Sequence, residues 1–272
     1  MTGIRRAAVE AEQSDVVDHA VRVGLVAYGV VHLLIAWLGL QIAFGETGKT
    51  ASASGAMHTL VQQPLGEVLV WAVGIGFVIL ALWRVLEAWQ AIRLEDGKEQ
   101  VLDPAGKLIA AVVYSALAIT AFQVAVGSSG GKGGGGGSTD SMTAQLMSVT
   151  AGQLLVGAVG LGILGYAGYL VHRGWTEKFL EELDGRHGRK AGKAYRWIGK
   201  IGHIGKGVAI ALVGGLFVWA AVTHDPKKSG GLDQALQQLR DQPFGQVVLV
   251  AISVGLACYG LFAFVWARHL SR

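Results

Sequence analysis

Six long apolar runs divide the chain. They cover approximately residues 23–44, 65–86, 108–126, 154–171, 204–222 and 247–265. Each has about the 20 residues that a helix needs to cross a hydrocarbon layer roughly 30 Å thick. In lipid these runs must be helical, because each backbone polar group has to be satisfied within its own segment. The pattern predicts an all-α polytopic membrane protein with six transmembrane helices; a large soluble helical core would need polar faces.

The apolar runs belong to a unit that is repeated three times. QPLGEVLVWAVGIGFVILALWR starts at residue 63, QPFGQVVLVAISVGLACYGLFAF at residue 242, and a weaker copy, TAGQLLVGAVGLGILGYAGYLV, at residue 150. Superposing Gly66, Gly152 and Gly245 also superposes Ala72, Ala158 and Ala251, and Gly76, Gly162 and Gly255. The chain is therefore read as a tandem triplication.

Each repeat contributes two spans, so all three enter and leave the membrane on the same side. We expect three parallel two-helix repeats related by a pseudo-threefold axis along the membrane normal. The expected segments are 1–22 (cytoplasmic amino-terminal segment), 23–90 (repeat 1), 106–172 (repeat 2, with a Gly-rich external loop), 173–203 (basic cytoplasmic connection) and 204–268 (repeat 3).

The shared Ala and Gly of each second span lie four residues apart, about one helical turn. Such a pair presents a flat patch that another helix backbone can approach closely. The pairs Ala72/Gly76, Ala158/Gly162 and Ala251/Gly255 are therefore predicted to be helix-packing patches.

Positive charge is distributed unequally between the two sides of these spans. Of the 23 Lys and Arg, 18 lie in the amino-terminal segment, the second and fourth connections and the tail, and 5 lie in the other connections. By the positive-inside rule both termini are cytoplasmic. The first span is read as a retained signal anchor, because the polar 22 residues before it do not form a cleavable signal peptide. Charge on one membrane face favours anionic lipid headgroups over nucleic acid as a partner.

The connections before the second and sixth spans contain short amphipathic segments. In GGLDQALQQLRDQPFG, apolar residues recur at helical spacing between polar ones, and SGAMHTLVQQPLG repeats the idea. Both predict short helices on the outer surface. The Gln-Pro pairs at 63–64 and 242–243 are expected to end these helices and start the spans.

These motifs resemble the bacterial domain-of-unknown-function 1206 family. The resemblance covers about Val21 to Arg268 and includes the Gln-Pro-x-Gly start and the Trp-Arg-x-x-Glu-Ala end at residues 83–88. The second repeat departs from it, with Thr-Ala-Gly at the start, and the third lacks the Trp-Arg end. The resemblance implies an integral membrane protein of the bacterial plasma membrane and names no activity.

Polar residues inside the apolar runs are the candidate intramembrane site. His32 lies near the middle of the first span, where a titratable group is costly. The sequence predicts a neutral imidazole hydrogen-bonded to Gln123 or Thr120 of the third span; a functional histidine is the alternative. Arg84 and Glu87, three residues apart, are predicted to pair, with Arg84 extending toward the headgroups; a role in gating or proton transfer is the alternative.

Motifs for catalysis or cofactor binding are missing from the sequence. It contains no HExxH, CxxC or paired-carboxylate motif, and its single cysteine is Cys258. We therefore expect no enzyme, cofactor or metal; an inner-face haem or metal on His172, His203 and His269 is the alternative. The run GSSGGKGGGGGSTD lacks the spacing of a phosphate-binding loop and predicts a flexible linker.

The fourth connection is the most distinctive polar segment. Trp175, Phe179, Leu180 and Leu183 predict an interfacial helix. The candidate lipid headgroup contacts that follow are Arg186, Arg189, Lys190, Lys193, Arg196, Trp197 and Lys200. A plain topology signal or a membrane protein partner would carry the same residues.

Three functions remain open at this point. A non-enzymatic accessory or scaffolding protein of the plasma membrane is the leading hypothesis, because catalytic groups are missing and small residues favour tight packing. A small-solute channel or carrier along the axis between the hairpins would need a polar, water-filled path. A membrane redox module would need a bound chromophore or metal.

Overall fold

The regular structure is helical throughout the described residues. The computed structural model describes residues 15–46, 48–94, 99–127, 143–149, 151–182 and 192–268. Its long helices are α2 (Asp15–Ala43), α4 (Gly66–Leu94), α5 (Glu99–Ala125), α7 (Gly152–Trp175), α9 (Lys193–Thr223) and α11 (Gly245–Arg268). All six are long and apolar enough to cross a membrane. The chain is a polytopic all-α membrane protein, as predicted.

The helices pack in an order that follows the repeats. The closest pairs are α4 with α5, α7 with α9, and α11 with α2. Each pair joins the second helix of one repeat to the first helix of the next, and the last repeat closes onto the first. This cyclic order of neighbours is the one that a pseudo-threefold arrangement requires.

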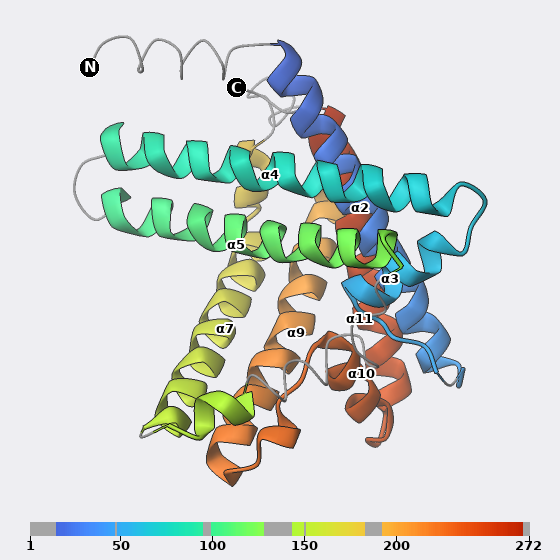
Figure 1. Cartoon of the computed structure of the whole chain (residues 1–272), viewed down its shortest axis with the longest axis vertical. Coiled ribbons are helices and arrows are strands. Elements are labelled where there is room, and N and C mark those ends of the chain that lie inside the picture. Colours follow the sequence, from blue (N-terminus) through green and yellow to red (C-terminus); the bar gives the residue numbers. More distant parts are fainter. Residues whose placement is uncertain are drawn as a thin grey trace.

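The second repeat departs from that arrangement. Within repeats 1 and 3, α2 packs on α4 and α9 on α11, whereas α5 and α7 are not among the well-packed pairs of the described residues. Figure 1 shows α4 and α5 side by side, crossing the other four long helices steeply. The predicted threefold relation therefore holds for the order of neighbours and fails for the direction of the α4–α5 pair.

A left-handed turn precedes the second helix of every repeat. The residue before the shared glycine has a positive φ in all three copies: Leu65 (60°), Ala151 (64°) and Phe244 (62°). A Cβ on that glycine would lie 1.8 to 2.3 Å from the carbonyl oxygen of the leucine six residues earlier, so only glycine fits. Pro64 and Pro243 lie in the turn and not in the first turn of the following helix, which corrects the expectation that they start the spans.

The two amphipathic segments before α4 and α11 form short helices, as predicted. These are α3 (Ala53–Val61) and α10 (Leu232–Arg240). Met57 of α3 and Leu236 of α10 are fully buried. The apolar faces of both helices therefore pack on the long helices.

Close glycine packing occurs at two of the three predicted patches. A Cβ built on Gly76 would lie 3.2 Å from Cα of Gly24 in α2, and one built on Gly255 would lie 2.6 Å from Cα of Gly205 in α9. At these two places the helix backbones are nearly in contact. Both glycines are confirmed as packing positions.

The other members of the predicted patches do not pack. Ala72, Ala158, Ala251 and Gly162 are exposed, and a Cβ on Gly162 would meet no atom within 4 Å. The helix α7 instead meets α9 through residues seven apart, Gly160, Ala167 and Gly174. Positions two apart differ by about 200° around a helix, so a face through residue 160 turns residues 158 and 162 away.

Candidate functional site

A lysine inside the apolar layer is the centre of the candidate site. Lys206 lies on α9, 17 residues before its outer end at Thr223, or about 25 Å along the helix axis. Its Nζ lies 4.0 Å from the ring centroid of Tyr259 and 4.9 Å from that of Tyr28, and it donates a hydrogen bond to the Tyr28 hydroxyl. The side chain is half-buried. The sequence prediction counted Lys206 among the cytoplasmic charges, which is wrong: it belongs to the span.

The two tyrosine rings are what makes this charge tolerable. A lysine in the centre of a transmembrane helix costs about 3 kcal/mol on insertion scales. A desolvated cation over an aromatic face is stabilised by about 2 kcal/mol. Within the described part of the chain Lys206 forms no ion pair. Two rings and one hydroxyl therefore offset a cost of similar size.

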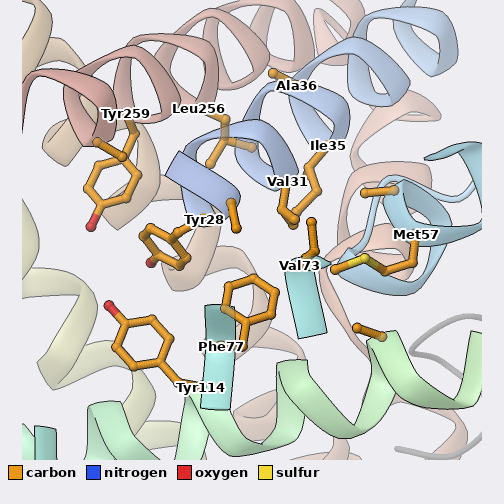
Figure 2. Close-up of a cluster of buried hydrophobic side chains, with 14 of the residues drawn as sticks. Tyr28, Val31, Ile35, Ala36, Met57, Val73, Phe77, Tyr114, Leu256 and Tyr259 are labelled. Atoms are coloured by element: carbon orange, nitrogen blue, oxygen red, sulfur yellow. The ribbon is translucent and has the colours of Figure 1, made fainter. Parts of the chain in front are cut away.

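Further aromatic rings surround the same place. The ring centroids of Tyr28 and Tyr114 are 5.4 Å apart and nearly perpendicular, and those of Tyr28 and Tyr259 are 6.0 Å apart. The ring of His32 packs on Tyr28 at 4.2 Å and on Tyr259 at 5.1 Å. Figure 2 shows the hydroxyls of the three tyrosines pointing toward the same side. We call Lys206, Tyr28, Tyr114 and Tyr259 the tyrosine–lysine cluster.

The cluster occupies equivalent positions of the three repeats. Tyr28 and Tyr114 each precede the shared glycine of their repeat by 38 residues, and Lys206 precedes its glycine by 39. In the second helices, Tyr166 and Tyr259 both lie 14 residues after that glycine. The sequence prediction missed these residues. Extending the alignment from the second helices into the first would have found them.

The predicted partners of His32 are wrong. Its Nδ1 lies 2.9 Å from the carbonyl oxygen of Tyr28, one turn earlier in its own helix. Gln123 is exposed on α5, and the Thr120 hydroxyl donates to the Ala116 carbonyl of its own helix. His32 is buried, as expected, but it is held by aromatic rings from other helices and not by a polar side chain.

A second buried histidine lies next to the cluster. His203 stacks on Phe179 at 4.8 Å and packs against Tyr259 at 5.1 Å, and its Nδ1 lies 2.8 Å from the Gly199 carbonyl oxygen. His172, its expected neighbour, is exposed, and His269 lies outside the described residues. The described residues contain no group of three or more His, Cys, Asp or Glu placed to hold a metal ion.

The segment after α7 folds into the helix bundle. It forms a 3₁₀ helix, η1 (Lys178–Glu182), in which Phe179 is completely buried. A Cβ on Gly199 would lie only 2.3 Å from the Phe179 ring, so the ring occupies the space that this glycine leaves. Phe179 therefore anchors the segment inside the protein, which corrects the predicted interfacial helix. Leu183 lies outside the described residues.

The predicted pairing of Arg84 with Glu87 is confirmed. Nη1 of Arg84 lies 2.8 Å from Oε2 of Glu87, and their side chains are 13% and 22% exposed. The Arg84 guanidinium lies 4.6 Å from the ring centroid of Trp83 and 5.5 Å from that of Trp266 in α11. It is thus held between indole rings, which replaces the expected extension toward lipid headgroups.

Part of the predicted headgroup surface lies at the start of α9. Lys193, Arg196 and Trp197 are exposed there, and Nζ of Lys200 lies 4.7 Å from the ring centroid of Trp175. Nε of Arg196 donates to Glu177 at 2.9 Å. The other candidates, Arg186, Arg189 and Lys190, lie outside the described residues. Lipid contact by this surface remains a prediction.

The chemistry available to the tyrosine–lysine cluster is that of hydrogen-bond donation. An ammonium group has only donors, and a phenol hydroxyl donates readily to an anion. The nearest charges that act on Lys206 are the guanidinium groups of Arg173 and Arg84. Such a set suits an anion better than a cation.

Comparison with known proteins finds the same threefold plan. The family model described as Domain of Unknown Function (DUF1206) matches residues 23–91, 105–177 and 201–269. An uncharacterized protein of Bacillus subtilis (strain 168), YxxB, is 29% identical over 244 residues, which is 89% of this chain and 87% of that protein. No solved structure matches. The chain is therefore a member of the DUF1206 family.

Proposed function

We propose that the chain is a non-enzymatic accessory or scaffolding protein of the bacterial plasma membrane, with both termini in the cytoplasm. The observation that carries this proposal is the packed interior where the repeats meet. Phe77 packs on Tyr28 and Tyr114 with ring centroids 6.3 and 6.4 Å apart, and its side chain is fully buried (Figure 2). Close packing of this kind fixes helices relative to one another and suits a rigid frame.

The cytoplasmic side of this frame supplies a binding surface. Lys193, Arg196, Trp197 and Lys200 at the start of α9 combine exposed positive charge with an indole ring. Basic segments next to a membrane attract anionic headgroups, and tryptophan favours the headgroup level. A membrane protein partner with an acidic surface would use the same residues.

A flux assay tests the packed interior. The full chain is reconstituted into vesicles that contain a pH-sensitive dye, and proton and small-anion entry are followed. We expect rates equal to those of empty vesicles. Saturable entry that depends on the protein would contradict the accessory function and support the second candidate, a small-solute carrier. That candidate is favoured by one observation, the half-buried Lys206 inside the apolar layer.

Hydrogen exchange tests the cytoplasmic surface. In nanodiscs, amides of residues 193–200 are expected to exchange more slowly with phosphatidylglycerol than with phosphatidylcholine. The triple variant Lys193→Gln, Arg196→Gln, Lys200→Gln should abolish the difference. Equal exchange of the wild-type chain in both lipids would remove headgroup binding from the proposal.

A further inference from the structure

We propose that Lys206 binds the phosphate of an anionic phospholipid at a lateral site next to α5, α7 and α9. This proposal goes beyond the accessory function and does not depend on it, because a scaffold and a carrier could each hold such a lipid. It also differs from the cytoplasmic surface at the start of α9, which is exposed outside the apolar layer.

The first argument is the unused donor capacity of Lys206. An ammonium group has three N–H donors. The only acceptor that Lys206 meets among the described residues is the Tyr28 hydroxyl. A cation in the apolar layer that lacks a described carboxylate partner attracts an anion, and a phosphodiester offers one negative charge with several acceptor oxygens.

The second argument is the character of the surrounding groups. Tyr166 is a near neighbour of Tyr28, Tyr114 and Tyr259, so four phenol hydroxyls lie around the ammonium. Arg173 adds positive charge. It lies 21 residues after the start of α7, about 31 Å along the helix, which places it at the inner boundary of the hydrocarbon layer. Lys206 lies slightly deeper, where its long side chain can meet a phosphate at that boundary.

The third argument is access from the lipid. Tyr166 is 43% exposed although its neighbours Tyr28, Tyr114 and Tyr259 are buried. On the same helix, a Cβ on Gly162, Gly165 or Gly168 would meet no atom within 4 Å. Because α5 and α7 do not pack closely within the described residues, this glycine face of α7 is free to receive acyl chains.

Acyl chains select a phospholipid over a soluble anion. A free phosphate would have to lose its water on entering an apolar layer, which is costly. A phospholipid reaches the same depth with its chains already in the layer. We therefore assign the site to a lipid phosphate, and we expect inorganic phosphate not to replace it.

Native mass spectrometry of the detergent-purified full chain tests the proposal. Phosphatidylglycerol and phosphatidylcholine are titrated separately, and the Kd of the first bound lipid is measured. Wild-type protein should bind phosphatidylglycerol more tightly than phosphatidylcholine. K206M should weaken phosphatidylglycerol binding by about tenfold, because it loses a charge-assisted hydrogen bond. K206R should stay within about threefold of wild type, since it keeps the charge.

A matched control and two further outcomes complete the test. Lys178→Met removes one exposed charge from η1 on the same side and should change the Kd by less than about threefold. Should K206M fail to yield monodisperse protein, Tyr166→Phe removes one donor and keeps the ring, and should weaken binding by about threefold. Unchanged phosphatidylglycerol affinity in K206M or, if needed, in Tyr166→Phe would overturn the proposal. So would displacement of the lipid by millimolar inorganic phosphate.

Discussion

Three glycines at the same place in three repeats meet three different surroundings. Gly76 touches α2 and Gly255 touches α9, whereas Gly162 touches nothing within 4 Å. The difference lies in the partner helix. The alignment places Val113 of α5 where α9 has Gly205, and Val113 is 48% exposed.

The comparison shows that a small residue on one helix does not create a contact by itself. Two backbones approach closely only when both helices are small at the crossing point. A β-branched side chain at position 113 keeps α5 from approaching α7 as α9 approaches α11. We call the packed side formed by α2, α9 and α11 the closed side, and the facing surfaces of α5 and α7 the open side.

The largest expected contrast is all-or-none cross-linking. In a Cys258→Ser background, Ala27→Cys with Gly76→Cys should form a disulfide in membranes, because a Cβ on Gly76 lies 3.3 Å from Cβ of Ala27. The equivalent open-side pair, Val113→Cys with Gly162→Cys, should not. Gel mobility before and after oxidation gives the result. Efficient cross-linking of the second pair would show that α5 and α7 meet after all.

Truncating a buried anchor should cost the most stability. Phe179→Ala leaves a cavity against α9 and α11 and is expected to cost about 3–5 kcal/mol. Leu161→Ala on the open side removes a side chain that is already exposed, and should change stability by about 0.5 kcal/mol or less. Thermal unfolding in detergent measures both. Equal losses would remove the distinction between the two sides.

Filling a glycine should have a somewhat smaller effect that again depends on the side. A Cβ on Gly205 would lie 2.5 Å from Cα of Gly255, so Gly205→Leu is expected to cost about 1–3 kcal/mol through overpacking. Gly162→Leu adds the same atoms where there is space and should be neutral or slightly stabilising, since glycine is a poor helix former. A large loss in Gly162→Leu would indicate that a helix covers this face.

Ion pairs should give the smallest contrast. Arg84→Met removes a partly buried partner of Glu87 at the closed side and is expected to cost about 1–3 kcal/mol. Arg196→Met breaks an exposed pair with Glu177 and should cost about 0.5 kcal/mol or less. Urea or thermal unfolding at low and high salt distinguishes them. The exposed pair should lose its contribution at high salt, and the partly buried one should keep most of it.

Much of the fold could be predicted because span length and repetition are local properties of a sequence. The six apolar runs give the six long helices, and the Arg84–Glu87 pair follows from a spacing of three on one helix. The direction of α4 and α5 could not be predicted, because it depends on side chains of other helices, such as Val113, that a repeat alignment treats as interchangeable.

The candidate site was harder to predict than the fold. His32 was recognised because a histidine stands out in an apolar run, but its partners are rings, whose contacts leave no polar signal in the sequence. Lys206 was assigned to the cytoplasmic connection because α9 begins far inside that basic segment, at Lys193. The helix extends past the membrane boundary, so charge alone did not mark where the span begins.

The left-handed turns before α4 and α11 have a consequence for how the protein is seated vertically. A non-glycine residue in that conformation costs about 1–2 kcal/mol. At Leu65 and Phe244 the side chain projects outward, with 79% and 84% of its surface exposed. Both lie where a span meets the outer surface. In a bilayer these two side chains enter the lipid beside the turn, so the strained positions act as pegs that set the depth of repeats 1 and 3, whereas Ala151 is too short to do the same for repeat 2.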